Sequence, residues 1–153
     1  MIAIDTNVLA YAAFAQADDR KAVAVRIIAD AALGDAILPM QVLVEFANAS
    51  LKRSHLSIAD TRRRIAEWSM IFPVIATVPD DVRAALDLVA ARRMSYFDAL
   101  IIATARRAGA SVLLTEDMHD GLDLDGLTIL NPFAAGNAAR LVDLLEPPLT
   151  PWS

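Results

Sequence analysis

Short apolar runs alternate along the chain with longer segments in which apolar residues recur every three or four positions. Runs of the first kind predict buried strands, and segments of the second kind predict amphipathic helices. The expected strands are residues 2–4, 36–38, 74–78, 111–114 and 127–130. The expected helices are residues 8–15, 19–33, 39–52, 58–72, 79–93, 96–108 and 138–145.

The alternation of strands and helices predicts the fold class. Short apolar strands followed by longer helices favour a parallel sheet that is covered by helices on both faces, which is an α/β fold. At 153 residues the chain has the size of one ordinary domain, and no internal repeat or interior linker divides it. We therefore expect a single domain over residues 1–153, in which residues 146–153 form a proline-rich tail.

Composition narrows the class of protein further. Apolar residues make up 56% of the chain and charged residues 22%, which excludes wholesale disorder. The chain contains no cysteine, so disulfides, thiolate metal sites and thiol nucleophiles are excluded. No apolar run reaches the roughly 18 residues of a membrane-spanning helix, and the N-terminus lacks the basic and apolar regions of a signal peptide. We expect a cytoplasmic protein that does not bind a membrane.

Basic residues gather in short clusters along an otherwise acidic chain. The net charge of −5 argues against nonspecific packaging of duplex DNA, but this uneven distribution leaves a nucleic-acid substrate open. Twelve of the 14 basic residues are arginine, whose planar fork suits phosphate. The clusters are Lys52-Arg53, Arg62-Arg63-Arg64, Arg92-Arg93 and Arg106-Arg107. For any one of these clusters, a solvated helix face is the simpler interpretation.

Four acidic residues stand among apolar neighbours, where an ionised carboxylate is costly. Asp5 and Asp117 each follow an expected strand, whereas Glu45 and Asp98 each lie in an expected helix. A buried carboxylate without a partner costs several kcal/mol, and basic residues are scarce in the sequence around Asp5, Glu45 and Asp98. A shared divalent cation is the simplest compensation for several such carboxylates.

The predicted topology allows the four acids to face one notch, because ligands of open α/β sheets bind at the carboxyl ends of strands. Oxygen ligands without histidine or cysteine suit Mg²⁺ or Mn²⁺, and the natural chemistry of such a site is metal-assisted phosphodiester hydrolysis. Each acid also has a structural interpretation. Asp5 suits a helix N-cap, Asp98 suits the positive end of a helix dipole, and Asp117 lies in an acid-rich loop. Glu45 is harder to explain in this way, although its helix has a partly polar face.

The ordered set of motifs resembles the PIN-domain ribonucleases. The segments that carry this resemblance are Ile4-Asp5-Thr6-Asn7-Val8-Leu9, Glu45, Tyr96-Phe97-Asp98-Ala99-Leu100-Ile101 and Leu114-Thr115-Glu116-Asp117. The segment Asn131-Pro132-Phe133 is similar to the ending of VapC-type toxins of bacterial toxin–antitoxin pairs. Each motif alone is weak, but the resemblance covers nearly the whole chain in order.

The resemblance implies a three-layer α/β/α sandwich and an endoribonuclease that uses Mg²⁺ or Mn²⁺. It implies a catalytic and metal-binding quartet of Asp5, Glu45, Asp98 and Asp117. The polar residues that support the quartet are Thr6, Asn7 and Thr115, and Glu116 stands beside Asp117 as an alternative inward acid. A homodimer and a small cognate antitoxin that blocks the site are also implied. We expect single-stranded or loop RNA as substrate, because an unstacked strand can bend a phosphate into a recessed carboxylate site.

Two other functions stand as alternatives. A haloacid-dehalogenase-like phosphatase would have a second aspartate where this chain has Asn7, and a later lysine, whereas Lys21 and Lys52 are both in the first half. The missing lysine also disfavours a response-regulator receiver. The non-enzymatic alternative is a catalytically silent PIN-like module that binds protein or RNA. His55 and His119 are interpreted as surface residues rather than general bases.

The expected helix at residues 79–93 has apolar residues on most of its sides. Ala84, Ala85, Leu88, Val89 and Ala91 belong to this set. One small domain covers only part of such a surface, so the pattern predicts a buried interface formed by self-association or with an antitoxin.

Overall fold

Strands and helices alternate through residues 1–15, 18–52 and 55–146, which are the residues that the computed structural model describes. The strands are β1 (Ile2–Ile4), β2 (Ala36–Pro39), β3 (Val74–Ile75), β4 (Val112–Leu114), β5 (Asp123–Leu124) and β6 (Leu127–Leu130). The α-helices are α1 (Thr6–Ala13), α2 (Asp19–Ala31), α3 (Met40–Lys52), α4 (Ile58–Ile71), α5 (Pro79–Arg92), α6 (Tyr96–Arg107) and α7 (Ala138–Leu145). Arg53 of the first basic cluster and residues 147–153 of the expected tail lie outside the described residues.

The strands form one sheet in the order β3-β2-β1-β4-β6-β5. All neighbouring pairs are parallel except β5 and β6, which are antiparallel. On the central strand β1, Ile2 lies opposite Ala36 of β2 and Val112 of β4. From β1 the chain builds the sheet on one side through β2 and β3, and it then builds the other side through β4, β6 and β5. The strand order therefore reverses between β1 and β4. Such a switch point opens a crevice at the carboxyl ends of the two strands.

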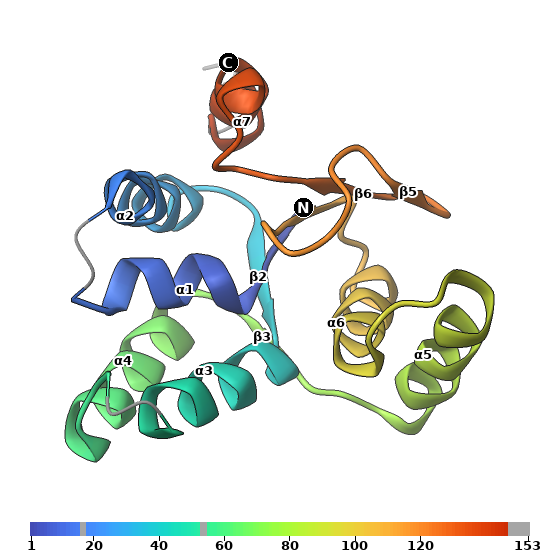
Figure 1. Cartoon of the computed structure of the whole chain (residues 1–153), viewed down its shortest axis with the longest axis horizontal. Coiled ribbons are helices and arrows are strands. Elements are labelled where there is room, and N and C mark those ends of the chain that lie inside the picture. Colours follow the sequence, from blue (N-terminus) through green and yellow to red (C-terminus); the bar gives the residue numbers. More distant parts are fainter. Residues whose placement is uncertain (16–17, 53–54, 147–153) are drawn as a thin grey trace, which may run out of the picture.

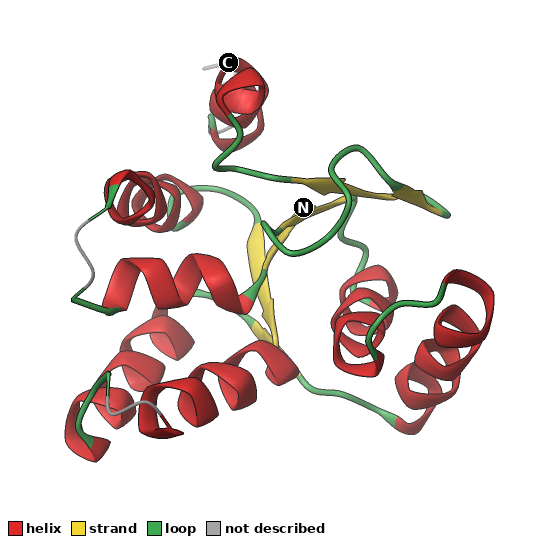
Figure 2. Cartoon of the chain, in the orientation of Figure 1, coloured by secondary structure: helices red, strands yellow, loops and turns green. Residues whose placement is uncertain are grey.

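Helices cover both faces of this sheet. Figure 1 shows α1 to α4 on one side and α5 with α6 on the other, while α7 lies beyond α2. Figure 2 shows the strands at the centre of the sheet between these two groups of helices, with the β5–β6 hairpin extending beyond them. The expected α/β/α sandwich with a mostly parallel sheet is confirmed. No helix in the described part of the chain is long and apolar enough to cross a membrane.

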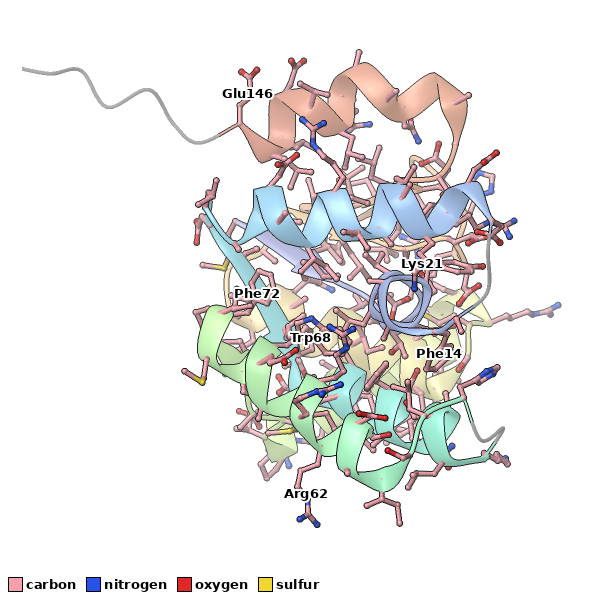
Figure 3. All side chains as sticks on the ribbon, turned by 90° about the vertical axis from the view of Figure 1, so that its left-hand side faces the viewer. Phe14, Lys21, Arg62, Trp68, Phe72 and Glu146 are labelled. Atoms are coloured by element: carbon pink, nitrogen blue, oxygen red, sulfur yellow. The ribbon has the colours of Figure 1, made fainter. Side chains whose placement is uncertain are left out.

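The core explains why the strands are so uniformly apolar. All residues of β1 and β4 are buried, and Ile4, Leu113 and Leu114 are fully inaccessible. Burial of each side chain of this size contributes about 1.5–3 kcal/mol. On the α1–α4 side, Phe46 packs edge to face against Trp68 with ring centroids 4.7 Å apart. The labelled Trp68 and Phe72 of this layer are visible in Figure 3.

Lys21 binds backbone carbonyl groups at the C-terminal end of α1. Lys21 Nζ donates to the carbonyl oxygens of Phe14, at 2.7 Å, and Ala12, at 3.2 Å. These are carbonyls that the end of a helix leaves without partners, and a cation there also suits the helix dipole. Figure 3 shows Lys21 of α2 beside this end of α1.

Two parts of the sheet differ from the prediction. The expected strand 74–78 ends at Ile75, because Ala76 O accepts from Arg107 and Val78 N donates to Asp81 instead of pairing in the sheet. Strand β5 lies in a region that was predicted as a loop. It forms a hairpin with β6 through Asp125 and Gly126, whose φ angles of 52° and 95° suit the mirror-image turn of a tight hairpin.

Candidate active site

Asp5 lies at the switch point, directly after β1, and is 3% exposed. It is the N-cap of α1, since its Oδ1 accepts a hydrogen bond of 2.6 Å from the backbone N–H of Thr6. Its other oxygen, Oδ2, accepts a hydrogen bond of 2.6 Å from the hydroxyl of Thr115, just after β4. The capping role and the site role of Asp5 are therefore compatible, because they use different oxygens.

Asn7 and Thr115 join the ends of β1 and β4 into one polar network. Asn7 Nδ2 lies 3.1 Å from Thr115 Oγ1, 3.1 Å from Asp117 Oδ2 and 3.3 Å from Asp5 Oδ2. Asn7 Oδ1 accepts from the backbone N–H of Glu116, and Thr115 Oγ1 accepts from that of Asp117. The side chains of Asn7 and Thr115 thus hold the loop after β4, and Asn7 Nδ2 binds the carboxylates of both Asp117 and Asp5.

Glu45 approaches the same end of the sheet from α3. Its Oε2 accepts from the hydroxyl of Thr6 at 3.3 Å, and its Oε1 accepts from Gln41 Nε2 at 3.1 Å. Thr6 therefore links Asp5 and Glu45. Its backbone N–H donates to the carboxylate of Asp5, and its hydroxyl donates to that of Glu45. Gln41 is one turn before Glu45 on the helix, a spacing at which side chains are neighbours.

Asp98 completes the group from the first turn of α6, where it is half-buried. Burial raises the pKa of its carboxyl, and the charges of Glu45 and Asp117 raise it further. Among the described residues, no hydrogen bond to its carboxylate is formed. Asp98 is thus the member of the group whose oxygens are uncommitted within the protein.

The pKa of Asp5 is affected by the neighbouring carboxylates of the group. Burial raises this pKa from 3.8 to about 6, against the lowering effect of the hydrogen bonds from Thr115 and Thr6. The negative charges of Asp98 and Glu45 add to the increase. Carboxylates from β1, α3, α6 and the loop after β4 therefore lie close enough to change one another's ionisation.

The group does not form a ready-made metal cage. No set of three or more histidine, aspartate or glutamate side chains within residues 1–15, 18–52 and 55–146 is placed to hold an ion in this arrangement. The donor set nevertheless fits Mg²⁺ or Mn²⁺, because these ions take oxygen ligands and keep several waters while one or two carboxylates hold them. Asp98, with its uncommitted oxygens, and Asp117, which is exposed, suit that role by their accessibility.

Glu116 points to a different partner from Asp117. Its Oε1 lies 3.2 Å from Arg20 Nη2 of α2, and Tyr11 lies next to both side chains. Burial raises the pKa of the Tyr11 hydroxyl, and the adjacent Glu116 carboxylate raises it further. Asn7 binds the carboxylate of Asp117 but only the backbone N–H of Glu116, so the polar network distinguishes between the two neighbouring carboxylates.

The partly polar face expected around Glu45 includes Gln41, four residues earlier on the same helix, and the two side chains are in contact. Sequence reasoning missed Tyr11 and Arg20 as neighbours of the acids. These two residues have no sequence signal, because their contacts to Glu116 cross about a hundred residues of chain.

In the described part of the chain, the ion pairs of the arginine clusters on α4 and α6 are formed with acids outside the group. Arg107 is at the opposite end of α6 from Asp98, about 13 Å along the helix axis, and is paired with the buried Asp81 at 2.7 Å. Arg106 pairs with Asp125. On α4, Arg63 and Arg64 pair with acids of their own helix, and Figure 3 shows Arg62 projecting away from the protein. The interpretation of these clusters as helix faces is the one that the contacts favour.

The two histidines lie in different surroundings. His119 is exposed, as predicted. His55 is not a simple surface residue, because its ring stacks on Phe14 with centroids 4.3 Å apart. The contact is that of an amphipathic ring packed on the edge of the core, and neither histidine contacts an acid of the group in the described ranges.

A polar hollow of about 650 Å³ lies at the other end of β4, near the β5–β6 turn. It is lined by charged residues that include Asp81, Arg106, Arg107 and Asp125. These residues already form two ion pairs with one another, Arg107 with Asp81 and Arg106 with Asp125. Their charges are therefore balanced, in contrast to the excess of carboxylates at the switch point.

A parallel sheet with carboxylates gathered at its switch point defines an α/β protein with an acidic site at the carboxyl ends of β1 and β4. The PIN domain model matches residues 2–119, which include all four acids, and the chain therefore belongs to the PIN domain family. No curated protein sequence matches the chain significantly.

Solved structures share the fold at low sequence identity. The toxin VapC20 of Mycobacterium tuberculosis, described as cleaving the sarcin–ricin loop, is 22% identical, with a TM-score of 0.64 over 76% of this chain and 90% of that one. A toxin–antitoxin complex from Klebsiella pneumoniae is 20% identical, with a TM-score of 0.63 over 87% and 98%. VapBC2 of Rickettsia felis, bound to a promoter DNA fragment, is 15% identical, with a TM-score of 0.62 over 86% and 98%. At these identities the likeness establishes the fold alone.

Proposed function

We propose that the chain is a single nuclease domain, an endoribonuclease that depends on Mg²⁺ or Mn²⁺ and acts as the toxin of a toxin–antitoxin pair. The observation that carries this proposal is the polar network through Thr6, Asn7 and Thr115, which holds Asp5, Glu45 and Asp117 at one end of the sheet opposite Asp98. Membership of the PIN domain family and the fold shared with toxin structures support it.

The chain's residues divide the work of the site between them. Asp98 and Asp117 would hold the cation, and Glu45 and Asp5 would add negative charge that favours it. Such an ion, when bound, would supply an activated water and neutralise charge on the phosphate that is cut. Asp5 is fixed by its two hydrogen bonds of 2.6 Å, and Asn7 orients Asp117 through Nδ2, so these two carboxylates are positioned before substrate arrives.

The shape of the site favours a flexible RNA. Asp5 is buried and Glu45 and Asp98 are half-buried, so a phosphate reaches them only if the strand bends inward. Single-stranded and loop RNA can bend in this way, whereas a paired duplex is stiff and keeps its phosphates outside the recess. The cleavage of the sarcin–ricin loop that is ascribed to VapC20 is in keeping with this preference.

A small antitoxin and a second copy of the chain are the proposed protein partners. Apolar side chains of α3, α4 and the segment after α4 line a groove of about 510 Å³ that includes Met40, Val44 and Phe72. Val44, which is 52% exposed, lies on the same helix as Glu45, so a protein that covers this groove contacts the helix that carries one of the acids. On the other side of the sheet, Leu86 of α5 and Phe97 of α6 are each 54% exposed and suit a self-association surface.

The test is cleavage of a fluorescent RNA hairpin, its fully paired counterpart and the matching DNA, each with Mg²⁺, Mn²⁺ or EDTA. The expected result is cutting of the hairpin loop with metal and none with EDTA. The Asp98→Asn variant is the matched control and should be inactive. RNA that stays intact with both metals, yet binds the protein, would support the catalytically silent binding module instead.

A further inference from the structure

We propose that Arg20 is a substrate-binding residue that holds an RNA phosphate beside the acidic site, with Tyr11 and Glu116 positioning its side chain. The inference rests on the proposed function and assigns the RNA contact that the acids themselves cannot provide. Five carboxylates gather at this end of the sheet, those of Asp5, Glu45, Asp98, Glu116 and Asp117. A polyanion that approaches them needs a cation of the protein as well as a metal ion.

Arg20 is the basic residue that stands at this border. Within residues 1–15, 18–52 and 55–146, it alone lies within ion-pair distance of any of the five carboxylates, through Glu116 at 3.2 Å. Glu116 immediately precedes Asp117, and Asn7 Nδ2 contacts the carboxylates of both Asp117 and Asp5. The guanidinium therefore lies one residue away from a proposed metal ligand, while Arg63 and Arg64 of α4 and both arginines of the α6 cluster pair with other acids.

The contacts of Arg20 place it without using up its donors. Its guanidinium carbon lies 5.3 Å from the centroid of the Tyr11 ring, and Phe133 packs edge-on against the same ring at 5.1 Å. A guanidinium that rests on an aromatic face keeps its plane fixed and its N–H groups directed outward. The side chain is nevertheless 47% exposed, so a ligand can reach those N–H groups.

The ion pairs of Arg20 are also loose compared with those of the structural arginines. Nη1 lies 3.5 Å from Asp18 and Nη2 lies 3.2 Å from Glu116, and neither contact has hydrogen-bond geometry in the described ranges. By contrast, Arg107 donates to Asp81 at 2.7 Å and 3.0 Å. Exposed ion pairs of the first kind contribute little to stability, so a phosphate can replace Asp18 as the partner of Nη1 at small cost.

The experiment compares Arg20→Ala with Arg26→Ala, a change of the same kind on the same helix. Arg26 pairs with Asp30 of its own helix at 2.8 Å and is 78% exposed, so it is a control for charge alone. Binding of a fluorescent single-stranded RNA is measured by anisotropy with Mg²⁺ in the cleavage-deficient Asp98→Asn background, between about 50 and 200 mM KCl. The kcat and KM for cleavage of the same RNA are measured with Asp98 intact.

Arg20→Ala is expected to weaken RNA binding about tenfold, the loss of one charge-assisted contact. It should reduce the slope of log affinity against log salt by about 0.7, the value for one phosphate of a single strand. KM should increase with kcat nearly unchanged, and Arg26→Ala should leave all of these quantities near the parent values. Arg20→Lys should recover the salt slope but only part of the affinity, because lysine keeps the charge and loses the planar fork.

The two proposals fail in different ways. If the parent protein binds RNA with the Arg20-dependent salt slope but does not cleave it, the nuclease function is wrong and the contact of Arg20 stands. If the protein cleaves RNA and Arg20→Ala behaves like Arg26→Ala, the inference is overturned while the nuclease function stands. Absence of RNA binding by the parent protein would overturn the inference, and a fall in kcat at unchanged KM would exclude a phosphate-binding role.

Discussion

Thr115 donates a hydrogen bond of 2.6 Å to Asp5 across the central pair of strands, although 110 residues separate the two in sequence. The bond joins the carboxyl ends of β1 and β4 at the switch point of the sheet. It lowers the pKa of Asp5 against the stronger effect of burial, and so keeps a buried carboxylate ionisable near neutral pH.

Replacing this hydroxyl should destabilise the protein when Asp5 is charged. Thr115→Val keeps the volume and removes the donor, so we expect a loss of about 2 kcal/mol in unfolding free energy at pH 8. At pH 5, where Asp5 is largely protonated, the loss should be smaller. Urea unfolding at both pH values measures the difference. Thr128→Val, the same change on β6 at a half-exposed position, is the control, and an equal loss in both variants would contradict the prediction.

The raised pKa of Asp5 predicts how the stability of the metal-free protein depends on pH. Since the folded pKa of about 6 is above the unfolded value of 3.8, the folded state binds more protons between them. Stability from Asp5 is therefore fully present below pH 3.8 and is lost as the pH increases through 6. The expected decrease in unfolding free energy is about 3 kcal/mol.

Asp98 contributes in the same direction because its pKa is also raised. Asp81 and Asp120, whose pKa values are lowered, act in the opposite direction and only below the ordinary aspartate pKa. In the Asp5→Asn variant, the free energy of unfolding should depend less on pH between pH 4 and 7. Urea unfolding in the presence of EDTA measures this dependence. A wild-type profile that rises through this range would show that Asp5 is not the dominant titrating group.

The fold and the gathering of the four acids at one end of the sheet could be predicted because the signals are local. Apolar runs mark β1 and β4, and an acid that directly follows a buried strand is conspicuous, as with Asp5. The two-residue strand β5 could not be placed in the same way, because its pairing depends on the turn at Asp125-Gly126 and on β6. The Asp-Gly pair was the available signal for that hairpin.

Sequence could not separate structural arginines from free ones. Arg106 and Arg107 are adjacent, yet only Arg107 reaches the buried Asp81, which lies 26 residues earlier in the chain. The shortened strand β3 has the same cause, since Arg107 also binds Ala76 O and draws that segment away from the sheet. Long-range pairs of this kind leave no periodic pattern in the sequence.

This difference gives a prediction about the two arginines. Arg107→Met should lower the melting temperature clearly more than Arg106→Met, because it leaves the Asp81 carboxylate, 2% exposed, without its cation. Arg106 pairs with a mostly exposed carboxylate, and its loss should have little effect. Calorimetry of the two variants at pH 7 measures the difference, and equal melting temperatures would show that the Asp81 pair is not important for stability.

The Asp98→Asn variant distinguishes a metal ligand from a structural acid by its stability with and without Mn²⁺. The change removes a charge at nearly constant volume from a group whose carboxylates repel one another, so the metal-free variant should be at least as stable as the wild type. Mn²⁺ at about one hundred times its dissociation constant should stabilise the wild type by about 2.7 kcal/mol, or roughly 5–10 °C in melting temperature. The variant should lose most of that increase, because the ion has lost a ligand.

If Asp98 only complements the helix dipole, the metal-free variant should instead lose about 0.3–1 kcal/mol and respond to Mn²⁺ like the wild type. Four melting curves after treatment with EDTA decide between these outcomes, and a wild-type protein whose melting temperature ignores Mn²⁺ would rule out the metal site.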